Sequence, residues 1–178
     1  PAFPCNISID QVAAHYAPPA YDTTVLERGM LVKLDVGVHV DGYIADTART
    51  VVVGEQDNKL VEAVEASLRR AISMVCDGVK TSDIGRGINE EIGRYGFKPI
   101  RNLSGHQINR YNLHAGKTVP NISCFDIHRF SEGEVYAIEP FVTLPNFSGI
   151  VSGSKKSYIF RLAKSRRLKD KDAYRLVD

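Results

Sequence analysis

Two aspartates occupy strand positions that would normally be apolar, and they are the first candidates for chemistry. The stretch "LDVGVHVDGYIAD", residues 34–46, predicts a β-hairpin with Asp41-Gly42 as its turn, because this dipeptide supplies the positive φ angles that a tight two-residue turn requires. Asp35 and Asp46 fall where the alternating pattern places half-buried side chains. A buried carboxylate is costly unless it is paired or holds a metal ion, so a metal site is one interpretation of this hairpin.

The register of the hairpin decides whether the two carboxylates can act together. A two-residue turn at Asp41-Gly42 places Gly37 opposite Asp46, and Asp35 then points to the same face because side chains alternate with period two. The two aspartates are then diagonal neighbours, roughly 7–8 Å apart at the backbone. A pair of divalent cations about 3.5–4 Å apart would fit between them, with Gly37 leaving room. The alternative is that both carboxylates are solvated, or that one of them caps a turn.

Other polar residues extend this candidate site. Glu139 in "VYAIEPF" lies in an apolar strand pattern, where an unpaired carboxylate would be costly, and no basic residue is near in sequence. His106 in "LSGH" and His114 in "NLHAG" lie among glycines and apolar residues, and His15 stands between alanines and a proline turn. Each histidine has a plainer interpretation as a hydrogen-bonded core or loop residue. Two aspartates, a glutamate and an imidazole suit Mn, Fe, Co or Zn and argue against a thiolate site.

Composition sets the broad class of the protein. The 178 residues are 43% hydrophobic and 25% charged, which is typical of a globular domain, and the net charge of +2 is too small to indicate nucleic-acid binding. No run of about 18 apolar residues predicts a membrane span, and the first residues do not resemble a signal peptide. The three scattered cysteines are typical of reduced thiols in the cytoplasm. The basic segment "AKSRRLKDKD" could contact RNA, but a solvated face is the favoured interpretation.

Hydrophobic periodicity predicts the elements that must position these side chains. Strands are expected at about 30–40 and 43–53, a single strand in "GEVYAIEPFVTL", and a short strand at 158–162. A helix is expected between an N-cap at Asp57 and a stop at Gly78, and a second one from Ser82 to about Tyr95. Short strands and functional loop are expected at 99–121, and the first turns of a helix at 169–178. The predicted apolar faces of the three helices are Leu60, Val64, Leu68, Ile72 and Val75; Ile84, Ile88 and Ile92; and Ala173, Leu176 and Val177.

These motifs together resemble a known family. The segments "PAFPCNIS", "AAHY", "KLDVGVHVDGYIADTA", "LSGH", "YNLHAGKTVPN" and "EVYAIEPF" are similar, in the same order, to those of type 2 methionine aminopeptidases, especially the archaeal ones. The resemblance covers nearly the whole chain. It implies a fold of mixed helices and strands, α/β (α+β), known as the pita-bread fold. In this fold two pseudo-symmetric halves enclose a two-metal site. It also implies removal of the initiator methionine from nascent proteins. The partners would be the N-termini of nascent polypeptides in the cytoplasm, possibly at the ribosome.

The resemblance also assigns roles to individual residues. The metal ligands it implies for two divalent ions (Co, Mn, Fe or Zn) are Asp35, Asp46, His106 and Glu139. His114 would act at the scissile amide and His15 beside the bound methionine, both in catalysis and in substrate binding. The residues that would line the methionine pocket are Phe3, Leu113 and Phe141. No membrane or specific nucleic-acid partner is implied, and the protein is expected to be a monomer.

The sequence departs from the family pattern at both ends. The fifth family ligand, a bridging glutamate in a Gln-Phe-Glu-His-Thr segment, does not occur, and a helix expected before "PAFP" is absent. Residues 1–150 are therefore expected to form a partial pita-bread catalytic domain, and residues 151–178 a truncated helical insert of the type 2 enzymes. We expect a fragment whose isolated form is inactive or weakly metal-binding. Two alternatives stay open, a non-enzymatic pita-bread module that binds RNA or ribosomes, and an aminopeptidase or prolidase directed at proline.

Overall fold

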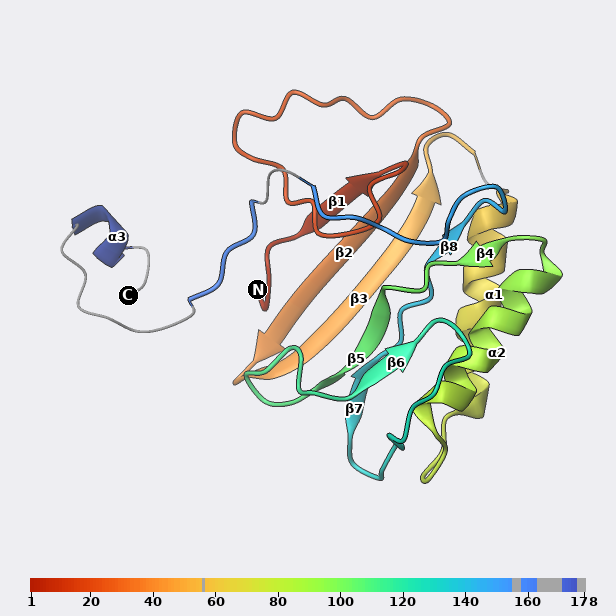
Figure 1. The fold of residues 1–178 in the computed structure, drawn as a ribbon. Coiled ribbons are helices and arrows are strands. Elements are labelled where there is room, and N and C mark those ends of the chain that lie inside the picture. Colours follow the sequence, from red (N-terminus) through yellow and green to blue (C-terminus); the bar gives the residue numbers. More distant parts are fainter. Residues whose placement is uncertain (56, 155–157, 163–170, 176–178) are drawn as a thin grey trace.

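The structure is a computed structural model that describes residues 1–55, 57–154, 158–162 and 171–175 (Figure 1). It mixes helices with short antiparallel sheets, as expected from the sequence. The strands are β1 (Asn6–Ile9), β2 (Leu31–Val40), β3 (Tyr43–Val52), β4 (Lys98–Pro99), β5 (Ser104–Ile108), β6 (Thr118–Pro120), β7 (Val135–Ala137) and β8 (Val142–Thr143). The helices are α1 (Lys59–Met74), α2 (Thr81–Arg94) and α3 (Lys171–Arg175).

The β2–β3 hairpin has the predicted register. Val40 pairs with Tyr43 and Gly37 with Asp46, and the turn residues Asp41 and Gly42 have φ angles of 50° and 84°. Strand β1 adds to the other edge of β2 and gives a three-stranded antiparallel sheet in the order β1-β2-β3. Strand β1 was not expected from the sequence, because four residues are too few to show a reliable alternation and its pairing with β2 is non-local.

The two helices pack together, but α1 uses a different face from the one predicted. Asn58, not Asp57, caps α1, and its side chain accepts a hydrogen bond from the backbone N–H of Leu60. The buried residues of α1 are the small ones, Ala63, Ser67 and Ala71. The predicted apolar stripe is only partly covered, and Ile72 is 57% exposed. Small side chains allow the closest approach of a neighbouring helix, so the contact face of α1 was not the most hydrophobic one.

The main core lies between these helices and the second group of strands. Ile84, Ile88 and Ile92 of α2 are fully buried, as their four-residue spacing predicted. They form one cluster with Ala71 of α1, Val119 of β6 and Phe130. The strands of this part form two sheets, β6-β5-β7 and β4-β8. In Figure 1, α1 and α2 run side by side along one side of the molecule, with these strands between them and the β2–β3 hairpin.

The strand predicted in "GEVYAIEPFVTL" is interrupted. β7 pairs with β5 and ends at Ala137, whereas β8 begins at Val142 and pairs with β4. Pro140 has no N–H to donate to a ladder, so the chain changes partner strand across Glu139 and Pro140. Glu139 therefore lies in the break between two strands and not within one.

Predictions for the last part of the chain had mixed outcomes. The short strand expected at 158–162 is wrong: the structure assigns no strand to these residues, and Phe160 is 83% exposed. The helix start is confirmed as α3, but the side chains of its expected apolar edge lie outside the described residues. The cysteines Cys5, Cys76 and Cys124 are free, as expected. Within the described part of the chain, no helix is long and apolar enough to span a membrane.

Candidate metal centre

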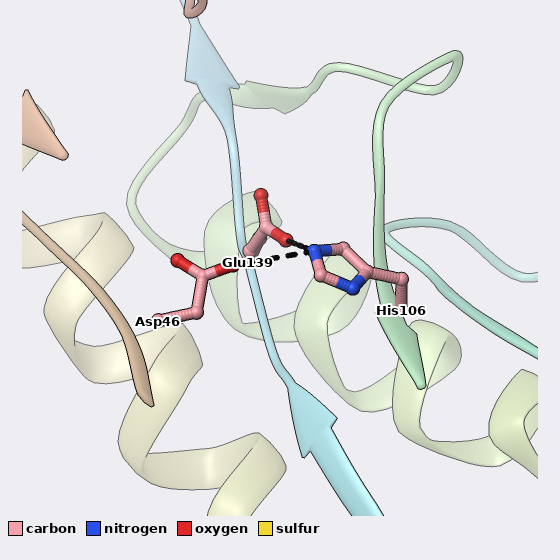
Figure 2. A group of neighbouring side chains, drawn as sticks. All are labelled: Asp46, His106 and Glu139. Carbon is pink, nitrogen blue, oxygen red and sulfur yellow. Dashed lines mark ion pairs between the residues drawn. The ribbon is translucent and has the colours of Figure 1, made fainter. Parts of the chain in front are cut away.

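Three of the predicted ligand side chains converge from distant parts of the sequence. Asp46 comes from β3, His106 from β5 and Glu139 from the break after β7, and their side chains point toward one another in Figure 2. The Nε2 atom of His106 lies 3.4 Å from Oδ2 of Asp46 and 3.0 Å from Oε1 of Glu139. One ligand atom of each residue lies within 4.8 Å of the others. A single small cation could therefore contact all three.

The donor atoms of this cluster fit a divalent cation. The side chains of His106 and Asp46 are only 10% and 12% exposed, so water cannot satisfy them fully. Oε1 of Glu139 is buried and accepts no aligned hydrogen bond, although Nε2 of His106 lies at hydrogen-bond distance. Two carboxylate oxygens and an imidazole nitrogen that face one another without aligned hydrogen bonds are suited to a metal ion. Nδ1 of His106 also lacks a partner among the described residues.

The electrostatics of the cluster favour positive charge. Burial lowers the pKa of His106, but the adjacent Asp46 and Glu139 outweigh it and raise that pKa to about 10. An imidazolium therefore balances the two carboxylates in the absence of a cation. Because a metal ion binds the neutral imidazole, the proton and the metal compete for the same nitrogen.

Asp35 lies on the same face of the sheet as Asp46, two residues along β2 from the partner of Asp46. Nδ2 of Asn6 donates a hydrogen bond of 3.0 Å to Oδ2 of Asp35, and Oδ1 of Asp35 is buried without a partner. Burial raises the pKa of the Asp35 carboxyl, the Asn6 hydrogen bond lowers it, and the charges of Asp46 and Glu139 raise it further. Asp35 is thus within electrostatic reach of the cluster and has one free oxygen to offer.

Two features of this region were not foreseen. The space that Gly37 was expected to leave for cations is filled by the ring of Phe3, which a Cβ atom at Gly37 would strike. Asn6 was not considered as a site residue, although it is 3% exposed and faces Asp35 across the β1–β2 ladder. No local sequence pattern marks Asn6, because its position opposite Asp35 follows only from the pairing of β1 with β2.

The predicted substrate residues are distributed around the cluster. The ring of His114 packs edge-on against that of His106, with 4.4 Å between centroids. Burial and the nearby His106 lower the pKa of His114. His15 is exposed and has a φ of 64°, and its charge influences both Asp35 and His114.

The three residues predicted for a methionine pocket lie in different surroundings. Leu113 lines a cavity of about 180 Å³ beside the hairpin turn, whereas Phe3 and Phe141 do not line it. Phe3 covers Gly37, and Phe141 is partly buried just before β8. Their roles in substrate binding stay predictions.

Comparison with known proteins identifies the family. The family model described as metallopeptidase family M24 matches residues 1–170, and the chain belongs to this family. Such a family implies the use of divalent metal ions, in agreement with the donor set of the cluster. The chain is 46% identical over 180 residues to the methionine aminopeptidase of Methanothermobacter thermautotrophicus, covering 99% of this chain and 60% of that protein.

Solved structures agree with this assignment. Methionine aminopeptidase from Thermotoga maritima matches with a TM-score of 0.70 and 31% identity, over 78% of this chain and 56% of that chain. Prolidase from Pyrococcus furiosus matches with a TM-score of 0.67 and 27% identity, over 79% of this chain and 41% of that chain. These neighbours confirm the pita-bread fold expected from the sequence. The chain spans about 60% of the length of the curated relative described above.

Proposed function

We propose that the whole protein to which this chain belongs is a methionine aminopeptidase, which removes the N-terminal methionine of nascent polypeptides. The observation that carries the proposal is the convergence of Asp46, His106 and Glu139, in a chain 46% identical to a methionine aminopeptidase. Asp35 completes the proposed ligand set for two divalent ions, drawn from Co, Mn, Fe and Zn. The protein would be a monomer in the cytoplasm and would act on its substrates at or near the ribosome.

The residues of this chain divide the work of hydrolysis. When bound, the divalent ions would lower the pKa of a water molecule and polarise the scissile carbonyl. Asp46, Glu139 and His106, whose side chains are 12%, 31% and 10% exposed, would hold these ions. His114, packed on His106, would donate a hydrogen bond to the oxygen of the scissile carbonyl as charge develops there. His15 would contact the substrate beside the methionine, and the proposed contacts to the methionine side chain come from Phe3, Leu113 and Phe141.

The test is hydrolysis by the full-length protein loaded with Co²⁺ or Mn²⁺. A Met-Ala-Ser peptide should be cleaved and an Ala-Pro peptide should not. His106→Ala should lower kcat/KM by more than about 100-fold, since loss of an outer-shell partner alone costs about 10–100-fold. Glu132→Gln, which removes an exposed carboxylate outside the cluster, is the matched control.

Cleavage of the Ala-Pro peptide in preference to the Met-Ala-Ser peptide would support the second candidate, a proline-directed peptidase. The observation that favours this alternative is the structural match to a prolidase. Failure to cleave either peptide, with metal bound, would contradict both enzymatic proposals and favour a non-enzymatic module.

A further inference from the structure

The proposed ligands come from two sheets that no strand ladder joins. Asp35 and Asp46 belong to the β1-β2-β3 sheet, and His106 belongs to the β6-β5-β7 sheet, from which the chain leads to Glu139. Within the described part of the chain, these sheets are separate. Ladder hydrogen bonds therefore fix the ligand positions within each sheet but not the distance between the two sheets.

A contact at the tip of the β2–β3 hairpin bridges the two sheets. The backbone N–H of Tyr111 donates a 2.8 Å hydrogen bond to the carbonyl oxygen of Gly42, and Nε of Arg110 donates one of 2.8 Å to that of Asp41. Both donors come from the loop that follows β5, and both acceptors are the turn residues of the hairpin. We call these four residues, Asp41, Gly42, Arg110 and Tyr111, the tip clamp.

The side chains of the clamp are packed as well as hydrogen-bonded. The Tyr111 ring lies directly on Gly42, where a Cβ atom would meet its ring carbons. The Arg110 guanidinium lies over two tyrosine rings, 5.3 Å from the centroid of Tyr43 and 5.4 Å from that of Tyr111. Such cation–π contacts stabilise by about 0.5–1 kcal/mol at exposed sites. The hairpin tip is thus held by several independent contacts.

The backbone of the clamp is strained in a way that implies a constraint. Tyr111 has a φ of 57°, in the left-handed region that a bulky residue rarely adopts. A conformation of this kind costs of order 1–3 kcal/mol and persists only when the surroundings over-determine it. Here the Gly42 hydrogen bond and a short bridge between Asn109 and Asn112 hold the loop in this shape.

The clamp is directly connected to the candidate site. Along the chain, Tyr111 lies between His106 and His114, and Leu113 lines the cavity that the hairpin turn also borders. On the other side, the turn leads within four residues to Asp46 of β3. Movement of the tip would therefore change the position of Asp46 relative to both histidines.

We propose that the tip clamp positions the two acidic ligands of the hairpin against His106 and Glu139, and so sets the metal affinity of the site. Arg110 is a positioning residue in this proposal, because it would act through its contacts with Asp41, Tyr43 and Tyr111. The reason is geometric: metal–ligand bonds to oxygen and nitrogen have narrow preferred lengths near 2.0–2.2 Å, so ligands from two unconnected sheets need a fixed separation. The inference rests on the proposed function only in taking these residues as ligands.

The test uses Arg110→Met in the full-length protein, which removes the donor but keeps an extended side chain. Arg110→Lys restores a cationic donor, and Arg69→Met removes an exposed arginine of α1 as the matched control. We expect Arg110→Met to speed hydrogen exchange of the Tyr111 amide and to weaken Co²⁺ binding, followed by its visible absorption, by about fivefold, the change for loss of one net hydrogen bond. Arg110→Lys should recover most of the affinity, and Arg69→Met should match the wild type.

Each outcome decides one part of the proposal. Equal Co²⁺ affinity in Arg110→Met and wild type would overturn it, as would an equal loss in Arg69→Met. Unchanged exchange of the Tyr111 amide would show that Arg110 does not hold the tip. If the wild type binds Co²⁺ and the variants behave as expected but Met-Ala-Ser is not cleaved, the proposed function fails while the clamp stands.

Discussion

The two parts of the molecule that contribute ligands are stabilised in different ways. The helix-and-sheet part, with α1, α2 and the β6-β5-β7 sheet, has a contiguous core in which three isoleucines of α2 are fully buried. The β1-β2-β3 sheet has long ladders, but on one face of β2 only Val32 is buried, and Val38 and Val40 are 51% and 76% exposed. His106 therefore lies in this well-packed part of α1, α2 and the β6-β5-β7 sheet, which we call the platform. Asp35 and Asp46 lie instead on a hairpin held by backbone pairing and the tip clamp.

This difference separates stability from site geometry. Hydrophobic burial stabilises the platform in proportion to the apolar area removed from water, so its response to mutation should be large and general. The hairpin buries less apolar area and is shaped by register and by its turn, so its mutations should change ligand positions more than global stability.

Truncation in the platform core should cost the most. Ile88→Ala removes three methyl or methylene carbons from a fully buried position of α2 and should lower the free energy of unfolding by about 2–5 kcal/mol. Val38→Ala, at a half-exposed position of β2, should cost less than about 0.5 kcal/mol. Urea unfolding measures the free energy of unfolding of both variants, and the comparison holds where their m-values match that of the wild type. Comparable losses in the two variants would contradict the contrast between the two parts.

Two glycines compare how the parts accept an added methyl group. A Cβ atom at Gly105 in β5 would meet the carbonyl oxygen of Ala137, a backbone atom of the neighbouring strand that cannot move aside. At Gly37 in β2 the nearest atoms to the added one belong to the ring of Phe3, a side chain that can rotate. Gly105→Ala should therefore destabilise by about 1–3 kcal/mol, and Gly37→Ala by less.

Gly153→Ala supplies the control for both, because no atom of the described residues, apart from those of its two chain neighbours, lies within 4 Å of a Cβ built there. Its unfolding free energy should stay within about 0.5 kcal/mol of the wild type. A loss for Gly37→Ala as large as that for Gly105→Ala would show that the hairpin is packed as rigidly as the platform.

The sequence predicted the local features of the fold and missed the non-local ones. The β2–β3 hairpin and α2 followed from a two-residue turn signal and from isoleucines four residues apart, which are properties of short segments. The prediction of the buried face of α1 was wrong, because this face depends on the closest approach of α2 and not on hydrophobicity alone. The break at Pro140 could not be placed without knowing that β7 and β8 have different partners.

The candidate site divides in the same way. Residue types and strand patterns were enough to single out Asp35, Asp46 and Glu139 as carboxylates in unexpected positions. The approach of Asp46 and Glu139 to His106 is a tertiary property, since β3 shares no ladder with β5 and Glu139 lies after the end of β7. Asn6 and the tip clamp were not found at all, because their contacts span 29 and 69 residues of the chain and no local pattern marks them.

The last prediction concerns the loss of stability at low pH, which should begin in the platform and not in the hairpin. The Glu134 carboxylate accepts hydrogen bonds from Lys117, Tyr136 and the backbone N–H of Ser131, which tie together the strands and loop on the platform. The hydrogen bond from Lys117, followed by that from Tyr136, lowers the pKa of Glu134 to about 2 from its usual 4.5. Because the pKa is depressed in the folded state, this carboxylate stabilises the protein above pH 4.5, and the contribution is lost as the pH falls toward 2.

Glu134→Gln should therefore give a shallower fall of stability between pH 4.5 and 2 than Glu132→Gln, which removes an exposed carboxylate from the same loop. The melting temperature of each variant, measured across this pH window, tests the expectation. Hydrogen exchange then locates the effect. In the wild type, acid should speed exchange in β5 and β7 before β2 and β3, because the Glu134 network belongs to the platform and leaves the hairpin ladder intact. Earlier loss of protection in the hairpin would show that acid acts first on the ligand-bearing sheet, and that the Glu134 network does not govern the acid response of the fold.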